Sequence, residues 1–262
     1  MQQAPAGGRR TTSGTASDFV QANLIVVPAA YAAELRLLCA RNPVPCPLIE
    51  ALEPGAYEPR CAPGADLRRD IPGYRVWRDG RLVERRTDVV DLWTDDVAAF
   101  LIGCSFTFEA ALIAAGLTIR HQQLGRNVPM YRTTILLAPA GRLHGHMVVS
   151  MRPFHAHDVE RAREATRPYI HAHGEPIAWG DPAALGILDI DAPDEGDAVP
   201  LAPLDVPVFW GCGVTTQAVA MESRIPLVIT HEPGQMFVTA LRHEQLHVGR
   251  SGNEAAPGSV LR

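Results

Sequence analysis

Two cysteines, Cys104 and Cys212, each follow a glycine at the end of an apolar run and precede a segment of helical character. In both copies Thr lies three residues after the cysteine, and Glu109 or Gln217 lies two residues further on. A strand that opens a helix in this way leaves backbone N–H groups able to hold a carboxylate or phosphate, and the helix dipole favours a thiolate. Two such turns facing one cleft could combine an anion site with reactive groups. The alternative is that Gly and Cys are only small enough to allow close packing.

Two arginines are placed to hold an anion. Arg152 follows Ser150 at the end of an apolar strand, and Arg132 stands beside another buried segment. The guanidinium group binds carboxylates through two parallel hydrogen bonds, and strand ends are common anion sites in open sheets. Pairing with a structural carboxylate is the alternative for each.

Three further residues could carry protons. His173 and Asp181 lie in a segment rich in Gly and Pro, and His231 follows an apolar strand, where it could act as a general base. The alternative is structural, because a His can cap a helix end and an Asp can fix a turn.

The composition excludes several classes of protein. All 24 basic residues are Arg, because the sequence has no Lys, so a Schiff-base lysine and a Gly-Lys-Ser/Thr phosphate loop are ruled out. A net charge of −5 without a basic run argues against nucleic acid as a partner. Five cysteines without a close pair indicate neither a disulfide framework nor a four-cysteine zinc site, and we expect no metal and no cofactor. No secretory signal or membrane span is evident, so we expect a cytoplasmic protein.

The pattern of apolar residues predicts a mixed α/β protein. We expect a helix over 28–42, a Pro-rich excursion over 43–73 that could cover a neighbouring copy in a homo-oligomer, and a hairpin over 74–84 around Asp79-Gly80. Helices should follow both Gly-Cys turns to about residues 115 and 222, with another over 158–171. The remaining expected strands are 117–121, 133–138, 146–151, 186–190, 206–210, 227–230 and 236–240.

The two strand–Gly-Cys–helix–strand units, about 95–155 and 205–242, predict an internal duplication with mixed parallel and antiparallel sheets. We expect one globular unit over residues 18–243. The ends, 1–17 and 244–262, are small and polar without periodicity and are predicted to be mobile tails.

Several segments, in order along most of the chain, resemble the D-glutamate cyclase family, whose members are also called hydro-lyases. They are Gly-Cys-Ser-Phe-Thr-Phe-Glu, Asn-Val-Pro-Met-Tyr-Arg-Thr, Val-Val-Ser-Met-Arg-Pro, His-Gly-Glu-Pro, Gly-Asp-Pro, Phe-Trp-Gly-Cys-Gly-Val-Thr and Thr-His-Glu-Pro-Gly. The chain departs from the family at Ala178 and Gln235, where His is usual, and at Ala240, where Asp is frequent. If either His is essential, these departures bear on substrate or activity.

The resemblance implies conversion of D-glutamate to 5-oxo-D-proline with loss of water. We assign the α-carboxylate to Arg152, with Arg132 as second choice, and the γ-carboxyl oxygens to the two Gly-Cys turns. The expected groups are then, for catalysis, Glu109, Cys104, Cys212, His173, Asp181 and His231, and for substrate binding, Arg152, Arg132, Ser105, Ser150, Gly213 and Thr215.

Three alternatives stay open. Cys104 or Cys212 could form a thioester, although a free carboxylate is a poor acceptor for a thiolate. The chain could be a hydro-lyase for another small carboxylic acid, or a carboxylate- or lactam-binding protein without turnover.

Overall fold

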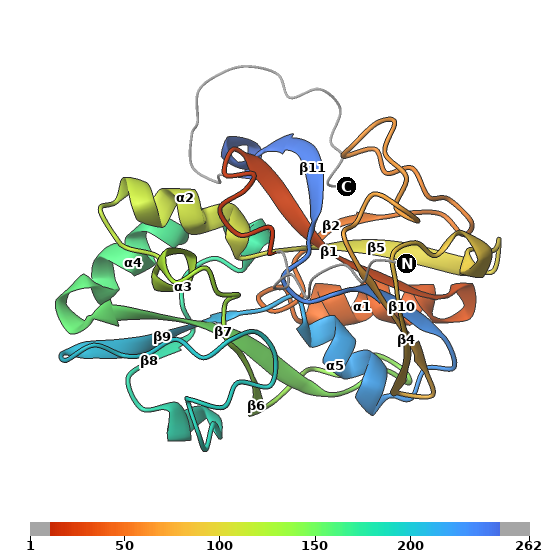
Figure 1. Ribbon diagram of the computed structural model, residues 1–262. Helices are drawn as coiled ribbons and strands as arrows, with labels where there is room; N and C mark the ends of the chain where they lie inside the picture. The colour runs from red at the N-terminus through yellow and green to blue at the C-terminus, as the bar shows by residue number, and fades with distance from the viewer. Residues whose placement is uncertain (1–10, 247–262) are drawn as a thin grey trace, which may run out of the picture.

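Two antiparallel sheets organise residues 11–246, the part of the chain that the computed structural model describes (Figure 1). Sheet A has seven strands in the order β2-β5-β1-β10-β3-β4, with β11 also paired to β1. Sheet B has four strands in the order β6-β7-β9-β8. The mixed α/β class is confirmed, but the expectation of mixed sheets is wrong, because every pairing of these strands is antiparallel.

Strand β1 (Phe19–Pro28) is the centre of sheet A. Its sequence, FVQANLIVVP, is apolar on both faces, and eight of its ten residues are buried. It pairs with β5 along its length and with β10 and β11 on its other edge. The other strands of sheet A are β2 (Leu48–Ala51), β3 (Tyr74–Arg78), β4 (Arg81–Arg86), β5 (Val97–Gly103), β10 (Val228–His231) and β11 (Phe237–Arg242).

The hairpin between β3 and β4 forms as predicted. Its two turn residues have positive φ, 48° at Asp79 and 79° at Gly80. A tight turn of this kind needs both residues in the left-handed region, which Asp-Gly adopts readily.

Sheet B contains the strand that leads into the second Gly-Cys turn. It consists of β6 (Met130–Leu136), β7 (His146–His155), β8 (Ala178–Trp179) and β9 (Asp205–Gly211). Strand β7 runs four residues beyond the predicted end, so Arg152 lies within the strand and not at its end. There it pairs with Val208 of β9.

The helices fill the spaces around the sheets. Helix α1 packs on one face of sheet A, whereas α2 and α4 lie together against sheet B and enclose Phe108 and Trp210 (Figure 1). The α-helices are α1 (Ala32–Arg41), α2 (Phe106–Ala114), α3 (Arg120–Gln123), α4 (Val159–Thr166) and α5 (Thr215–Glu222); single 3-10 turns are η1 (Ala29–Tyr31), η2 (Val90–Leu92), η3 (Ala156–Asp158), η4 (Ile170–Ala172), η5 (Pro182–Leu185) and η6 (His243–Leu246). None of the helices within residues 11–246 has the length and apolar character needed to cross a membrane.

Three expected elements are corrected. Residues 117–121 form no strand, because α3 begins at Arg120 and turns His121 inward. Residues 186–190 follow a 3-10 helix that ends at Gly186 with φ 79°, and they make turns instead of a strand. The helix predicted over 158–171 stops at Thr166, whose hydroxyl donates to the carbonyl of Ala162.

Both Gly-Cys units have the predicted order of strand, turn and helix, but β5 belongs to sheet A and β9 to sheet B. The duplication itself stays a prediction. Residues 1–10 and 247–262 lie outside the described residues, so most of the two predicted tails is not addressed. Contacts with the globular unit nevertheless begin before residue 18, because Thr12 exchanges backbone and side-chain hydrogen bonds with Gly234 and Met236.

Candidate active site

The two Gly-Cys turns meet in one buried apolar cluster, where each cysteine caps its own helix. The backbone N–H of Phe106 donates to Cys104 Sγ at 3.4 Å, and the sulfur of Cys212 accepts from the backbone of Val214. The two cysteines share this cluster with Met130, Val148 and Met236 among others. Each thiol therefore accepts a hydrogen bond from a backbone N–H group that we expected to bind an anionic ligand.

Neither cysteine has the features of a ready nucleophile. Burial raises the pKa of the Cys104 thiol well above its ordinary range and raises that of Cys212 to about 11. The expectation that the helix dipole favours thiolates at these turns is corrected, because desolvation in the apolar cluster outweighs the dipole.

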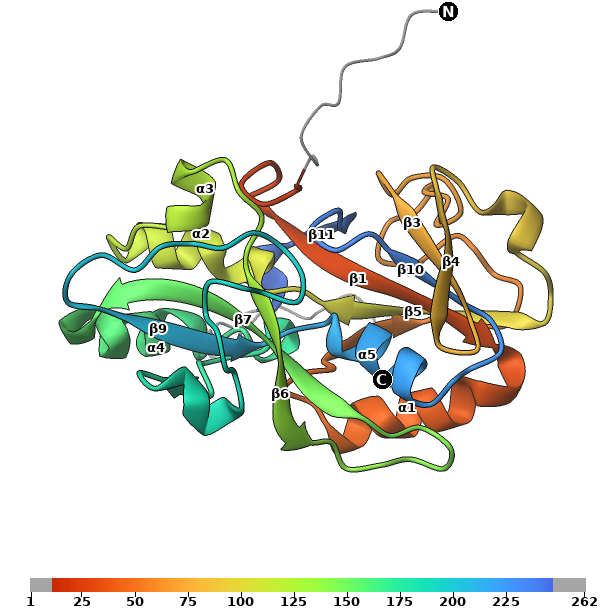
Figure 2. The same ribbon diagram turned by 60° about the horizontal axis from the view of Figure 1, so that its bottom comes forward.

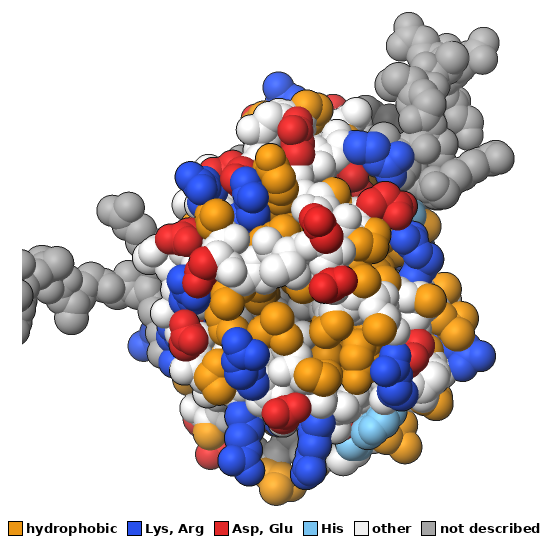
Figure 3. Space-filling view, turned by 90° about the vertical axis from the view of Figure 1, so that its right-hand side faces the viewer, with side chains coloured by type: hydrophobic (Ala, Val, Ile, Leu, Met, Phe, Trp, Pro, Cys, Tyr) orange, Lys and Arg blue, Asp and Glu red, His pale blue; other side chains and the backbone are white. Residues whose placement is uncertain are grey.

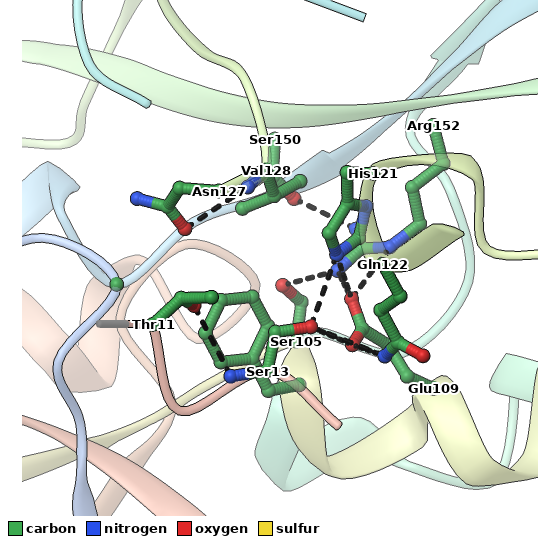
Figure 4. Close-up of polar contacts among 12 residues, drawn as sticks. Thr11, Ser13, Ser105, Glu109, His121, Gln122, Asn127, Val128, Ser150 and Arg152 are labelled. Atoms are coloured by element: carbon green, nitrogen blue, oxygen red, sulfur yellow. Dashed lines mark hydrogen bonds and ion pairs between the residues drawn. The ribbon is translucent and has the colours of Figure 1, made fainter. Parts of the chain in front are cut away.

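Glu109 and Arg152 form the charged centre of the first unit (Figure 4). Glu109 lies on the first turn of α2, and Arg152 reaches it from β7 of the other sheet, with Nε 3.0 Å from Glu109 Oε1 and Nη2 on the same oxygen. The guanidinium also donates to Ser105 Oγ at 3.0 Å and to Ser150 Oγ at 3.2 Å. Four predicted site residues from two sheets thus come together, with Arg152 and Glu109 only 1% and 2% exposed.

The other oxygen of Glu109 is covered by residues that the sequence analysis did not single out. Ser13 Oγ donates to Glu109 Oε2 at 2.8 Å, and Gln122 Nε2 donates to the same oxygen at 2.6 Å. His121 Nε2 lies 3.2 Å from Glu109 Oε1 and 3.1 Å from Ser13 Oγ. Figure 2 shows the segment before β1 looping beside α3, which carries His121 and Gln122.

Ser13, His121 and Glu109 do not form a catalytic triad. In a triad the carboxylate binds one ring nitrogen of the histidine and the hydroxyl binds the other. Here both groups approach Nε2, and Nδ1 of His121 is buried without a partner within the described residues. The cluster is better described as a shared proton and charge network around Glu109.

The charges set the ionisation of Glu109. Burial raises the pKa of its carboxyl, but Arg152 and His121 outweigh burial and bring the pKa down to about 2. Glu109 is therefore a carboxylate at neutral pH, and it accepts a proton only when its pairing with Arg152 loosens.

His173 lies next to this centre in a strained backbone conformation. Its φ is 83°, Nδ1 is 2.7 Å from the carbonyl of Val44, and Nε2 is buried with no hydrogen-bond partner among residues 11–246. Burial, assisted by the positive charge of Arg152, lowers the pKa of His173 to about 4. The ring is thus neutral at pH 7, with one nitrogen available.

His231 belongs to the second unit. Its Nδ1 lies 3.3 Å from the carbonyl of Leu24, and Gln217 Nε2 donates to the backbone carbonyl of His231 at 3.1 Å. Burial lowers the pKa of His231 to about 4. The structure thus separates His231 from the Glu109 centre and gives it a neutral partner.

Four other predicted residues lie outside the charged centre. Asp181 is exposed and accepts from the backbone N–H of Ala183, which is the structural role of capping η5. Arg132 is exposed on β6 and contacts Met221 Sδ. Thr215 accepts from the backbone N–H of Val148, and Gly213 sits where a Cβ would lie 2.0 Å from Asn23 Nδ2.

The sequence does not point to three of the residues around Glu109, namely His121, Gln122 and Ser13. His121 was expected at the end of a strand, and Ser13 in a tail. Arg120–Gln123 is four consecutive polar residues in a single helical turn, which is too short to give a periodic signal. Residues 11–246 hold no group of three or more His, Cys, Asp or Glu side chains placed to bind a metal ion.

Comparison with known proteins identifies the family of this fold and site. The family profile described as D-glutamate cyclase matches residues 98–240, which include both Gly-Cys units, Glu109 and Arg152. The chain belongs to the D-glutamate cyclase family.

Curated relatives extend the similarity over almost the whole chain. A "Putative hydro-lyase" of Geobacillus kaustophilus (strain HTA426) is 54% identical over 240 residues, which cover 91% of each chain. Proteins of the same description from Stutzerimonas stutzeri (strain A1501) and Streptomyces coelicolor are also 54% identical, over 90% of this chain and 90% and 86% of theirs. Among solved structures, a nitrogen repressor-like protein from Methanococcus jannaschii aligns at a TM-score of 0.35 and 10% identity over 84% of this chain and 87% of its own, a likeness too weak to bear on fold or function.

Proposed function

We propose that this chain is a hydro-lyase that converts D-glutamate to 5-oxo-D-proline and water. The observation that carries the proposal is the Glu109–Arg152 centre at a Gly-Cys turn within the residues that match the D-glutamate cyclase profile. The descriptions of the relatives as hydro-lyases support the same reaction class.

The reaction needs anion binding and proton transfer but no net acid or base. The α-nitrogen attacks the γ-carboxyl carbon, so a C–N bond forms and a C–O bond breaks. Two protons leave the ammonium nitrogen, and both end on the departing oxygen, which leaves as water. A group that takes a proton from nitrogen and returns it to oxygen is therefore sufficient.

Arg152 is suited to hold a substrate carboxylate. Its guanidinium already lies in a carboxylate complex with Glu109, and Ser105 and Ser150 fix its orientation. In our proposal the substrate carboxylate takes part of this coordination in place of Glu109. The released Glu109 then becomes a stronger base, because the charge that lowers its pKa is shared with the substrate.

Glu109 and His121 form the proton-transfer pair. His121 Nε2 is 3.2 Å from Glu109 Oε1, a distance over which a proton can pass as the pair exchanges charge. A thioester through Cys104 or Cys212 is disfavoured, because burial raises the pKa of both thiols.

Access to this centre requires a movement of the N-terminal segment. Residues 11–15 cross the first unit, and Ser13, itself 9% exposed, takes one oxygen of Glu109. We expect this segment to withdraw when substrate enters, with Ser13 giving up its place to a polar group of the substrate.

Proton NMR of the full chain with D-glutamate, and separately with L-glutamate, tests the proposal by formation of 5-oxoproline. We expect product from the D isomer. Glu109→Gln should reduce turnover at least 100-fold, since it removes the proton carrier while retaining the shape of the side chain. Glu50→Gln is the matched control: Glu50 is another buried carboxylate, bound to Arg60 and to the N–H of Cys61, and its loss should leave turnover near the wild-type value.

Full turnover by Glu109→Gln would contradict the assignment of the proton carrier. Absence of product from both isomers, together with a thermal shift on adding 5-oxoproline or glutamate, would instead favour a lactam- or carboxylate-binding protein. Absence of both product and shift would direct the search to another small carboxylic acid.

A further inference from the structure

A second concentration of arginines lies away from the Glu109 centre, where the β3–β4 hairpin meets the end of α5. Arg78, Arg81, Arg132 and Arg224 line one groove of about 580 Å³, together with Asp79 and Glu222. Figure 3 shows basic side chains gathered around an acidic one at the lower edge of the face it presents, where the surface is hollowed. The groove has four positive and two negative side chains in a protein of net charge −5.

These four guanidinium groups form no ion pair with a carboxylate anywhere within residues 11–246. The contrast on the same hairpin is clear, because Arg75 pairs with Glu195 and Glu232, and Arg85 also pairs with Glu232. Of the two acidic residues in the groove, Glu222 already binds His146. The four arginines therefore outnumber the carboxylates of the groove, and none of the four is neutralised by an ion pair within the described residues.

The hairpin register adds an independent observation. Arg78 and Arg81 are cross-strand partners at the tip of the hairpin, so two like charges face each other in one ladder. Such pairs are destabilising unless an anion lies between or beside them. Sheet packing does not require this arrangement, since both side chains are exposed.

The groove is also preformed. A Cβ at Gly80 would lie 2.3 Å from the carbonyl oxygen of Met221, so the tip of the hairpin rests directly on the last turn of α5. A second, much smaller hollow of about 20 Å³ adjoins the groove through Arg132 and Met221 and reaches Gln217. Arginines on a fixed frame bind anions at a lower entropic cost than those on mobile segments.

We propose that this groove binds a small, multiply charged anion, a molecule that carries two or more phosphate or carboxylate groups. The guanidinium fork matches both kinds of oxyanion, and four forks exceed what one carboxylate needs. The site is separate from the Glu109 centre, and the proposal does not depend on the reaction proposed above.

Isothermal titration calorimetry of the full chain with pyrophosphate, with citrate and with acetate, at matched ionic strength, tests the proposal. We expect saturable binding of pyrophosphate, citrate or both, and none of acetate. The double variant Arg78→Gln/Arg81→Gln should weaken that binding at least tenfold. In the absence of anion, its thermal midpoint should be equal to or above that of the wild type, because a repulsive pair has been removed.

The matched control is Arg36→Gln/Arg41→Gln, which removes two exposed arginines of α1 and the same total charge. It should bind as the wild type does. Failure of both pyrophosphate and citrate to bind, or equal weakening in the two double variants, would overturn the proposal. Preference for one of the two anions identifies which oxyanion the groove takes.

Discussion

Glu109 on α2 and Gln217 on α5 hold the same position in their turns, five residues after the cysteine, yet their surroundings are opposite. Glu109 binds a buried arginine and a histidine, whereas Gln217 binds the backbone of a neutral histidine. Each helix also contacts the sheet to which its preceding strand does not belong. Helix α2 comes after β5 of sheet A, but its Glu109 binds Arg152 on β7 of sheet B. Helix α5 comes after β9 of sheet B, but its Gln217 binds His231 on β10 of sheet A.

The difference shows that the same arrangement of strand, Gly-Cys turn and helix can hold either a charged or a neutral buried centre. A carboxylate at this position allows an arginine to be buried at 1% exposure, because the two charges and two serine hydroxyls satisfy each other. An amide at the equivalent position needs only neutral partners. The charged unit is therefore the one that we expect to perform chemistry.

The largest effect should come from breaking the ion pair of the first unit. Arg152→Met leaves Glu109 as a buried carboxylate without its main partner, which costs about 3–5 kcal/mol of the free energy of unfolding. Urea unfolding followed by circular dichroism measures this. The double variant Glu109→Gln/Arg152→Met should recover part of the loss, and no recovery would mean that Arg152 acts through packing on Phe108 and Trp210 instead.

Protonation of the two buried histidines and protonation of Glu109 should lower stability in different pH windows. His231 and His173 have pKa values lowered to about 4 from 6.5, so the unfolded chain takes up protons first and stability falls as the pH decreases from 6.5 to about 4. The pKa of Glu109 is lowered to about 2 from 4.5, so its contribution is complete above pH 4.5 and is lost as the pH falls toward 2. Each group contributes on the order of 3 kcal/mol.

Unfolding free energies at a series of pH values separate these contributions. His231→Asn should remove about half of the loss between pH 6.5 and 4, and Glu109→Gln should flatten only the loss below pH 4.5. His144→Asn, at an exposed histidine, is the control and should change neither window. A histidine variant that altered only the lower window would refute this division.

Converting the second unit toward the first should destabilise it at neutral pH. Gln217→Glu places a carboxylate beside His231 and near Glu232 without supplying an arginine, and we expect a loss of about 2 kcal/mol. NMR titration should also show the pKa of His231 rising, because the new charge favours its protonated form. An unchanged histidine pKa would show that residue 217 does not control the second unit.

The smallest effect concerns the N-terminal cover of the first unit. Ser13→Ala removes hydrogen bonds to Glu109 and His121, which should cost about 1 kcal/mol. Alkylation of Cys104 by iodoacetamide, followed by mass spectrometry, should become faster, with buried Cys39 and Cys61 as internal references. The same rate at Cys104, relative to Cys39 and Cys61, in the variant and in the wild type would mean that Ser13 does not cover the site.

The sequence predicted individual turns and candidate residues of the site better than the contacts between them. The Gly-Cys turns and the hairpin at Asp79-Gly80 follow from local patterns, because short-range sterics and apolar periodicity determine them. The same patterns also placed Glu109 and Arg152 among the candidate site residues. The contact between Glu109 and Arg152 does not follow, since it joins two sheets over 43 residues of chain.

Other misses have equally specific causes. Residues 186–190 are apolar enough for a strand, but Gly186 turns the chain beside Thr134 and Leu188 is 97% exposed, so apolar character alone misled the prediction. His121 is hidden in a one-turn helix too short for a periodic signal. The sulfur caps at Cys104 and Cys212 depend on how deeply the turns are buried, which no local pattern reports.

The pairing of β1 with the last strands of sheet A has a consequence for how the protein is made. Ile25 pairs with Thr230, and Ala22 pairs with Phe237, so the central strand meets its partners only after more than 200 further residues have been synthesised. Until then one edge of the apolar strand β1 lacks its hydrogen-bond partners. Long-range strand pairing is slow, so aggregation can compete with folding during this time. Folding of sheet A, and with it completion of both units, therefore waits until β10 and β11 have been synthesised.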